Sequence, residues 1–153
     1  MQRYYLENMY LKNLLMVPGA LNYAGTAIDL TKIDVPCFFL AAKDDHIVRW
    51  DKCWCALNII PNCEFVLTES GHIAGVVNHP SRGKYGYYTA SKTSDAESWF
   101  SEAKYNSGSW WVQWLEWVKP LSGDENYELD NPYHLVAKDY GLMDAPGSYV
   151  LAK

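Results

Sequence analysis

Residues 33–42 read Ile-Asp-Val-Pro-Cys-Phe-Phe-Leu-Ala-Ala, and this stretch decides the fold. Its centre, from Val35 to Leu40, is a nearly continuous apolar run, which is typical of a strand buried on both faces in a parallel sheet. Pro36 stands at the start of the run, where its missing N–H harms the sheet least. The charged loop Lys-Asp-Asp-His at residues 43–46 follows at once. We therefore predict a buried strand that ends in a polar loop.

The next segments complete a strand–helix–strand unit. Trp50, Trp54 and Leu57 recur at helical spacing and predict a helix over residues 50–58. After Pro61, residues 63–67 (Cys-Glu-Phe-Val-Leu) predict a second strand, which runs into the loop Thr-Glu-Ser-Gly-His at residues 68–72. Strands that alternate with a helix indicate a βαβ crossover and a parallel sheet. The predicted fold class is therefore α/β.

The sequence on either side of this unit predicts shorter elements. Residues 20–31 are short and mixed, with a turn at Gly25, and predict a small hairpin. Residues 78–98 are polar and rich in Gly, Ser, Thr and Tyr, and predict a loop. An amphipathic helix over residues 4–16 is predicted from apolar residues at helical spacing, namely Leu6, Met9, Tyr10, Leu14 and Val17.

A tryptophan-rich helix is predicted over residues 110–118, with Ser109 as its N-cap and Pro120 and Gly123 after its end. We expect its apolar face to pack in the core rather than to bind substrate. That face consists of Trp110, Trp111, Trp114, Leu115 and Val118. Residues 1–123 are thus predicted to form one domain, and residues 124–153 an irregular tail with a weak strand at residues 149–151.

Composition limits the function classes. The 153 residues are 49 % hydrophobic and 20 % charged, which is typical of a globular chain. The net charge of −5 argues against a nucleic-acid or anionic-membrane partner. We find no apolar run of membrane-spanning length and no signal-peptide core at the N-terminus, so neither a transmembrane segment nor secretion is predicted.

The four cysteines give no metal motif. Cys53 and Cys55 are separated by one residue, whereas a zinc site usually has paired C-x-x-C spacing, and Cys37 and Cys63 are isolated. A chain without a secretion signal is expected in a reducing compartment, where disulfides are rare. We therefore predict inert, buried thiols and no metal site.

Polar side chains follow both predicted strands, at the sheet edge where open α/β sheets bind ligands. Asp45 follows the first strand and His72 the second. A carboxylate that orients an imidazole base is the arrangement that activates a nucleophile. In the α/β-hydrolase triad the acid and then the histidine follow a nucleophile on a sharp Gly-x-Ser-x-Gly-type elbow. No such elbow, with serine or cysteine, occurs here, so the chain is predicted to be the C-terminal portion of an α/β-hydrolase-like fold with an incomplete sheet.

Simpler interpretations remain for the same residues. An aspartate after a strand is often a turn former or helix cap, and a histidine in a glycine-containing loop is often merely solvated. For Asp44 and His46 taken singly, we favour such structural roles. A serine hydrolase of the same fold, such as an esterase or depolymerase, and a non-catalytic fragment are the alternative functions.

Several motifs resemble polyhydroxyalkanoate synthases of the short-chain, class I type. They are Asp-His-Ile-Val-x-Trp at residues 45–50, Ser-Gly-His-Ile-Ala-Gly-Val at residues 70–76 and Gly-Ser-Trp-Trp-x-x-Trp at residues 108–114. The resemblance runs from about residue 5 to residue 118, and Pro-Gly-Ser-Tyr-Val at residues 146–150 resembles the family's ending. Arg49 and His79 stand where the family commonly has proline, and neither is the proposed acid or base.

The resemblance implies a function. Enzymes of this family polymerise (R)-3-hydroxyacyl-CoA thioesters with release of CoA, through a Cys-His-Asp triad and without a cofactor. They act as homodimers at polyester granules in the bacterial cytoplasm. By that resemblance His72 is the general base and Asp45 the triad acid, whereas the cysteine nucleophile belongs to an elbow that this chain lacks. The isolated chain is therefore predicted to be inactive, and which of the two residues activates the 3-hydroxyl is left open.

Overall fold

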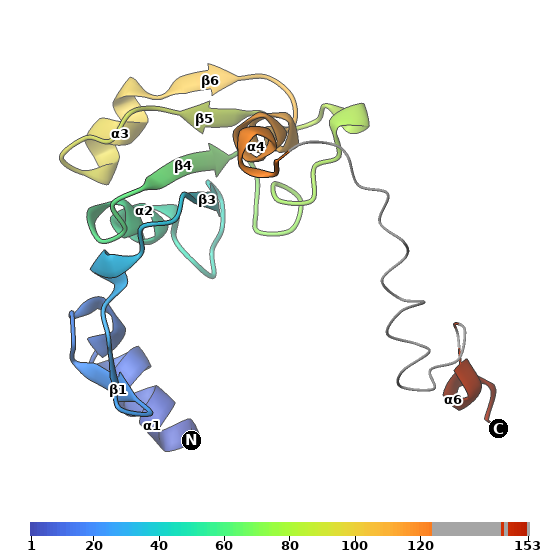
Figure 1. Cartoon of the computed structure of the whole chain (residues 1–153). Helices are drawn as coiled ribbons and strands as arrows, with labels where there is room; N and C mark the ends of the chain where they lie inside the picture. Colours follow the sequence, from blue (N-terminus) through green and yellow to red (C-terminus); the bar gives the residue numbers. More distant parts are fainter. Residues whose placement is uncertain (124–144, 146, 153) are drawn as a thin grey trace. The chain divides into compact units, whose positions relative to one another are not determined.

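A four-stranded mixed sheet is the framework of the chain (Figure 1). The computed structural model describes residues 1–123, 145 and 147–152, in two units, Met1–Val118 and Lys119–Lys153. The sheet lies in the first unit in the order β3-β4-β5-β6. Its strands are β3 (Cys37–Ala42), β4 (Cys63–Thr68), β5 (Tyr87–Thr89) and β6 (Lys104–Asn106). β3 and β4 are parallel, and the other two pairs are antiparallel.

The predicted βαβ unit is confirmed. Between β3 and β4 the chain forms α2 (Trp50–Trp54), which continues as the 3₁₀ turn η4 (Cys55–Asn58). In the register of this parallel pair, Cys37 lies opposite Cys63 and Ala42 opposite Thr68, so β3 and β4 end at the same level. The two polar loops therefore leave the sheet side by side.

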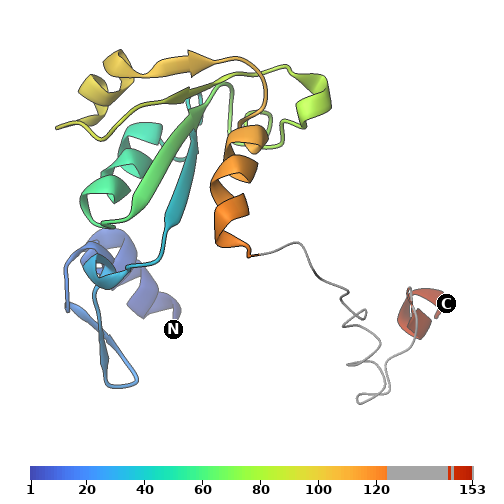
Figure 2. The ribbon, with the colours of Figure 1, turned by 45° about the horizontal axis from the view of Figure 1, so that its top comes forward.

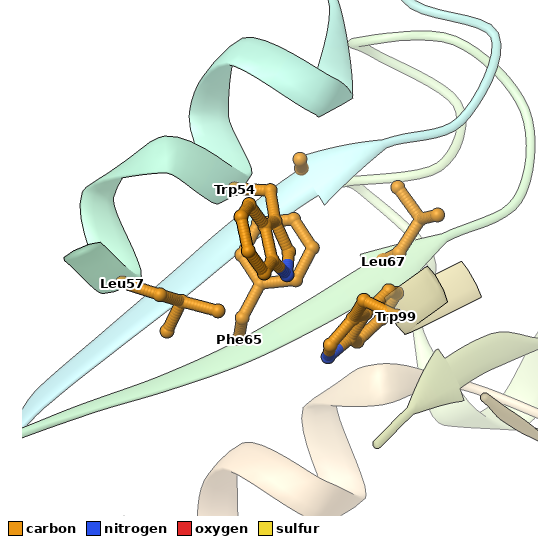
Figure 3. Packing of buried hydrophobic residues seen from close by; sticks show 6 residues of the cluster. Trp54, Leu57, Phe65, Leu67 and Trp99 are labelled. Carbon is orange, nitrogen blue, oxygen red and sulfur yellow. The ribbon is translucent and has the colours of Figure 1, made fainter. Parts of the chain in front are cut away.

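The core lies on the α2 side of the sheet (Figure 3). Trp99 is fully buried there. Its ring packs edge-on against the Phe65 ring, with the ring centroids 5.0 Å apart, and its indole N–H donates to the Ala90 carbonyl. Trp99 comes from α3 (Ala96–Glu102), whose N-cap Asp95 accepts the Ser98 N–H. The buried cluster comprises Ala41, Trp54, Leu57, Phe65, Leu67 and Trp99.

The opposite face of the sheet is covered by α4 (Trp110–Val118). Figure 2 shows α2 and α4 on opposite sides of β3 and β4. Phe38, which alternates with the core-facing Phe39 along β3, contacts the rings of Trp110 and Trp117. The predicted helix bounds are confirmed, and the Ser109 hydroxyl accepts the Trp111 N–H.

The prediction that the α4 residues form a core face is wrong for part of the helix. Trp114 is 41 % exposed and Leu115 58 %, whereas Trp110 and Trp111 are half-buried. Trp110 and Trp117 contact Phe38, whereas Trp114 and Leu115 keep much of their surface exposed. Helical spacing alone does not show which side of an apolar stripe meets the sheet.

The burial expected for the first strand also needs correction. Cys37 to Leu40 are half-buried, and only Ala41 and Ala42 of β3 are buried. β3 is the edge strand of the described sheet, so it has a neighbour on one side only. In β4, which has a neighbour on each side, residues 65–68 are all buried.

Residues 78–98 are not simply a loop, as the composition predicted. They contain the 3₁₀ turn η5 (Pro80–Arg82), strand β5 and the start of α3. β5 is only three residues long, which is too short to display an alternating pattern. Its order comes from pairing with β4 and β6, and such distant partners leave no local signal.

The N-terminal segment differs from the single predicted helix. It forms α1 (Gln2–Tyr5), a π-helical turn η1 (Leu6–Leu11) and, after a break, the 3₁₀ turn η2 (Leu14–Met16). The break falls at Asn13, whose positive φ of 51° ends the helical path. The predicted hairpin is confirmed as β1 (Leu21–Tyr23) and β2 (Thr26–Ile28), with positive φ at Ala24 and Gly25.

In the second unit the described elements are η6 (Lys119–Leu121) and α6 (Gly147–Leu151). α6 occupies the place of the predicted strand at residues 149–151, so that prediction is wrong. Most of the predicted irregular tail, residues 124–144, lies outside the described residues. None of the helices among the described residues is long and apolar enough to cross a membrane.

Candidate active site

Two loops at the carboxyl ends of β3 and β4 form the candidate site. Backbone hydrogen bonds continue the parallel pairing past the strands. The Lys43 N–H donates to the Thr68 carbonyl at 2.8 Å, and the Asp44 N–H donates to the Ser70 carbonyl at 2.9 Å. The loops are therefore fixed to one another before either reaches its candidate catalytic residue.

Asp45 and His72 lie together across these loops. Oδ1 of Asp45 is 3.6 Å from Nδ1 of His72, and the side chains are 12 % and 38 % exposed. This distance suits an ion pair with a protonated imidazole and is too long for a hydrogen bond. The structure thus brings together the predicted acid and base, while their catalytic roles stay predictions.

The Asp45 carboxylate is held by its own loop. Oδ1 accepts the N–H groups of Ile47 at 2.8 Å and Val48 at 3.1 Å. The hydrogen bond from Val48 is the largest cause that lowers the pKa of Asp45; the bond from Ile47 and the charges of His72 and His46 add to it, and desolvation opposes it. The carboxylate is therefore ionised at neutral pH, as an orienting group must be.

Replacing Asp45 by asparagine should lower the free energy of unfolding at neutral pH. Because the folded-state pKa of Asp45 lies below the usual 3.8, its ionised form contributes stability above that value, and this is lost as pH falls through the folded-state pKa. Urea unfolding of both proteins between pH 7 and pH 3 should show a constant difference down to about pH 5, then a narrowing one. A difference that widens toward acid would contradict this prediction.

The loop that carries His72 is tightly folded around Gly75. The Gly75 N–H donates to the Gly71 carbonyl, and the Gly75 carbonyl accepts the Thr68 hydroxyl. Ser70 adopts a positive φ of 68°, which turns the chain sharply after β4. A Cβ atom on Gly75 would collide with the Glu69 carbonyl oxygen, so glycine is required by space.

The Gly75→Ala change should therefore destabilise the fold, by about 1–3 kcal/mol or more, since the colliding atom is backbone. Gly71→Ala is the matched control in the same loop. There the nearest atom, the Asp44 carbonyl oxygen, would lie 3.8 Å from the added Cβ atom, and a change of under about 1 kcal/mol is expected. Urea midpoints of the two variants give the comparison, and equal midpoints would contradict it.

Two tryptophans of α4 secure the same loop. The indole N–H groups of Trp110 and Trp111 both donate to the Val76 carbonyl, at 3.1 and 3.0 Å. These two side chains therefore form hydrogen bonds in addition to packing, and sequence reasoning missed this contact. The available signal was chemical: a partly buried tryptophan usually finds an acceptor for its N–H.

Glu69 fastens the start of the His72 loop to the antiparallel strands. Its Oε2 accepts the Gly86 N–H at 2.8 Å and the Tyr105 hydroxyl at 3.2 Å. The Glu69 N–H in turn donates to the Gly86 carbonyl. β5 and β6, which the sequence did not predict, thus help to position His72.

Asp44 and His46 stand beside this pair. Both are exposed, and the His46 ring centroid lies 5.6 Å from that of His72. One potential ligand atom each of Asp45, His46 and His72 falls within 4.8 Å of the others. The structure therefore brings His46 to the site as a third polar group.

Two of the four cysteines, Cys53 and Cys63, have the properties of unreactive thiols. All four are free and half-buried, which is less buried than expected. Burial is the largest cause that raises the pKa of Cys63, to about 11, and it likewise raises that of Cys53, where Asp45 and Asp51 add to it. A raised pKa leaves little thiolate at neutral pH, whereas a nucleophile needs the thiolate.

Comparison with protein-family models gives no match. Among curated proteins the chain is similar to Poly(3-hydroxyalkanoate) polymerase subunit PhaC of Cupriavidus necator, with 36 % identity over 152 residues, 98 % of this chain and 26 % of that protein. It is 38 % identical over 154 residues to Poly(3-hydroxyalkanoate) polymerase 2 of Ectopseudomonas oleovorans, covering 97 % of this chain and 26 % of the relative. A third relative, Poly(3-hydroxyalkanoate) polymerase subunit PhaC of Rhizobium meliloti, is 37 % identical over 96 % of this chain and 24 % of its own length.

The chain spans about a quarter of the length of the curated relatives it matches. The alignments with these relatives cover nearly all of its 153 residues, so the family resemblance of the separate motifs is confirmed. The chain therefore belongs to the poly(3-hydroxyalkanoate) polymerase family.

Proposed function

We propose that this chain supplies the acid and the base of an acyltransferase that polymerises (R)-3-hydroxyacyl-CoA and releases CoA. The observation that carries the proposal is the approach of Asp45 and His72 to 3.6 Å on adjacent loops. Those loops leave the carboxyl ends of two parallel strands joined by a helix, which also supports an α/β-hydrolase-like assignment. The names of the relatives support the polyester product.

In the proposed reaction His72 moves protons and Asp45 orients it. Nδ1 of His72 faces the Asp45 carboxylate, which assigns the proton transfer to Nε2. A catalytic hydrogen bond that is long without substrate often shortens in the reacting complex. Nε2 takes the proton of the cysteine thiol, and the thiolate attacks the thioester carbonyl carbon. The bond from that carbon to the CoA sulfur breaks, and CoA leaves with the proton from His72.

Chain growth needs a second proton transfer. The 3-hydroxyl of one acyl unit loses its proton as its oxygen attacks the thioester carbonyl of another, and the released thiolate recovers a proton. His72 and Asp45 both stay candidates for this base. The preference for short acyl chains likewise stays a prediction.

CoA release from 3-hydroxybutyryl-CoA tests the proposal. The purified 153-residue chain should release no CoA above the buffer rate, because none of its four cysteines stands in the Gly-x-Cys-x-Gly elbow that carries a nucleophile in this fold. A polymerase of the relatives' length that contains this segment should release CoA and form polyester. Turnover by the chain alone would show that it holds its own nucleophile, and an inactive longer protein would contradict the acyltransferase proposal.

An exposed apolar hollow on α4 supports association with polyester. It has a volume of about 460 Å³ and an almost wholly apolar lining. An apolar surface of this kind suits contact with a polyester granule. Its lining residues are His79, Pro80, Trp110, Trp111, Val112, Trp114 and Leu115. Granule association in the bacterial cytoplasm is thus part of the proposal, whereas the homodimer rests on the resemblance alone.

A further inference from the structure

His46 is a polar side chain at the site that the proposed reaction does not use. It is exposed, it follows Asp45 directly, and its ring lies 5.6 Å from the ring of His72. A carboxylate oxygen and one nitrogen from each imidazole lie within 4.8 Å of one another. Three ligands that suit the same metal thus come from two loops that backbone hydrogen bonds already hold together.

The spacing of Asp45 and His72 fits a shared metal ion. Their 3.6 Å separation is too long for a hydrogen bond. Zinc binds imidazole nitrogen and carboxylate oxygen at about 2.0–2.2 Å, and at a tetrahedral angle two such ligands lie about 3.4 Å apart. Asp45 and His72 are therefore close to the separation of two zinc ligands. Because Oδ1 of Asp45 already accepts the N–H groups of Ile47 and Val48, binding requires one of these hydrogen bonds to give way, and the exposed His46 side chain must turn inward.

We propose that Asp45, His46 and His72 form a binding site for Zn²⁺ in which a bound ion inhibits the enzyme. Two histidines and one carboxylate, with water in a fourth position, are a common zinc ligand set. The backbone N–H groups of Ile47 and Val48 fix the carboxylate in place and help to keep it anionic. The half-exposed His72 and the exposed His46 leave a path for the ion to enter.

Inhibition follows from the tautomer that the metal imposes; this step rests on the proposed function. Nδ1 of His72 faces Asp45, so a shared ion would bind Nδ1. Metal on Nδ1 leaves the ring proton on Nε2, which then donates a hydrogen bond and has no lone pair to accept a proton. The ion also occupies the carboxylate that orients the ring. The bound metal would thus block proton transfer by His72 rather than act as a cofactor for it.

Calorimetric titration of the 153-residue chain with Zn²⁺ tests the site. We expect one saturable site and at least a 10-fold weaker affinity in His46→Ala and in His72→Ala, since loss of outer-shell partners alone costs 10–100-fold. His79→Ala is the matched control, because His79 caps η5 and packs on Trp111, away from the cluster; its affinity should be unchanged. Wild-type affinity in His46→Ala would overturn the proposal, as would the absence of a saturable site.

Co²⁺ as a spectroscopic probe separates this site from binding by the free cysteines. Nitrogen and oxygen ligands should give tetrahedral cobalt bands without a thiolate-to-metal charge-transfer band, and His46→Ala should lose these bands. A charge-transfer band that survives in His46→Ala would assign the metal to the thiols and overturn the proposal. Circular dichroism of the variants checks that each is folded.

Enzyme inhibition distinguishes the metal site from the catalytic proposal. In a longer polymerase that contains this segment, Zn²⁺ should lower CoA release reversibly, and a chelator should restore it. Relative to its own zinc-free rate, His46→Ala should need at least about 10-fold more Zn²⁺ for half inhibition. Zinc binding that depends on His46 but leaves CoA release unchanged would uphold the metal site, overturn its inhibitory role and contradict the role of His72 as the base.

Discussion

The His72→Ala change is expected to lower the rate of CoA release by about 10²–10⁴-fold in a polymerase that contains this segment. Nδ1 of His72 lies 3.6 Å from the Asp45 carboxylate, and His72 sits on a loop fixed by Gly75, Glu69 and the two indoles on Val76. Removal of a positioned general base leaves the thiol protonated at the moment of attack. The measurement is the initial rate with 3-hydroxybutyryl-CoA across pH.

His46→Ala is the control for this prediction, because His46 is the neighbouring imidazole and is exposed. Its loss of rate should be far smaller, and its rate should keep the pH profile of the parent enzyme. In His72→Ala the residual rate should lose the inflection that an imidazole base produces. A larger loss in His46→Ala would reverse the assignment of the base. If both variants unfold at the same temperature as the parent enzyme, neither loss of rate reflects misfolding.

Local sequence patterns sufficed for the central βαβ unit. The apolar run in β3, the i, i+4, i+7 spacing of Trp50, Trp54 and Leu57, and the apolar β4 each produce one element regardless of the rest of the chain. The polar loops after both strands follow from the same reading. That was enough to place Asp45 and His72 on adjacent loops, since parallel strands end at one edge of a sheet.

The elements that sequence reasoning missed depend on distant partners. β5 is a strand because residues 87–89 pair with β4 and β6, and its polar flanks conceal this. α3 had a local signal in its N-cap Asp95, which the polar composition of its surroundings outweighed. The prediction of a single N-terminal helix failed for the opposite reason. Apolar spacing predicted a helix that continues through Asn13, where the backbone instead adopts a positive φ.

The support of the site also escaped prediction. The contact of Trp110 and Trp111 with Val76 joins residues more than thirty positions apart, so no local spacing encodes it. Asp45 was predicted as an acid, but its own N–H donors, Ile47 and Val48, emerge only from the turn that the loop adopts. Sequence patterns thus name the reacting groups, while the geometry that holds them comes from tertiary contacts.

Trp99→Ala should have the largest effect on stability, a loss of about 3–5 kcal/mol in the free energy of unfolding. Trp99 is fully buried, packs edge-on against Phe65, and donates its indole N–H to the Ala90 carbonyl. Truncation removes the ring, leaves a cavity between α3 and the sheet and deprives that carbonyl of its donor. Domains are stable by only about 5–15 kcal/mol, so urea unfolding followed by circular dichroism should show a much lower midpoint.

Trp114→Ala is the matched control, since it deletes the same side chain from a site that is 41 % exposed. Trp114 keeps 41 % of its surface exposed, so truncation removes less buried area than at Trp99, and we expect a clearly smaller loss of stability than in Trp99→Ala. In a longer polymerase the same variant tests the apolar hollow. If the hollow contacts polyester, Trp114→Ala should weaken granule association by more than its small loss of stability explains. A fall in midpoint equal to that of Trp99→Ala would mean that Trp114 is buried by other parts of the protein, and that the outer face of α4 is an internal contact.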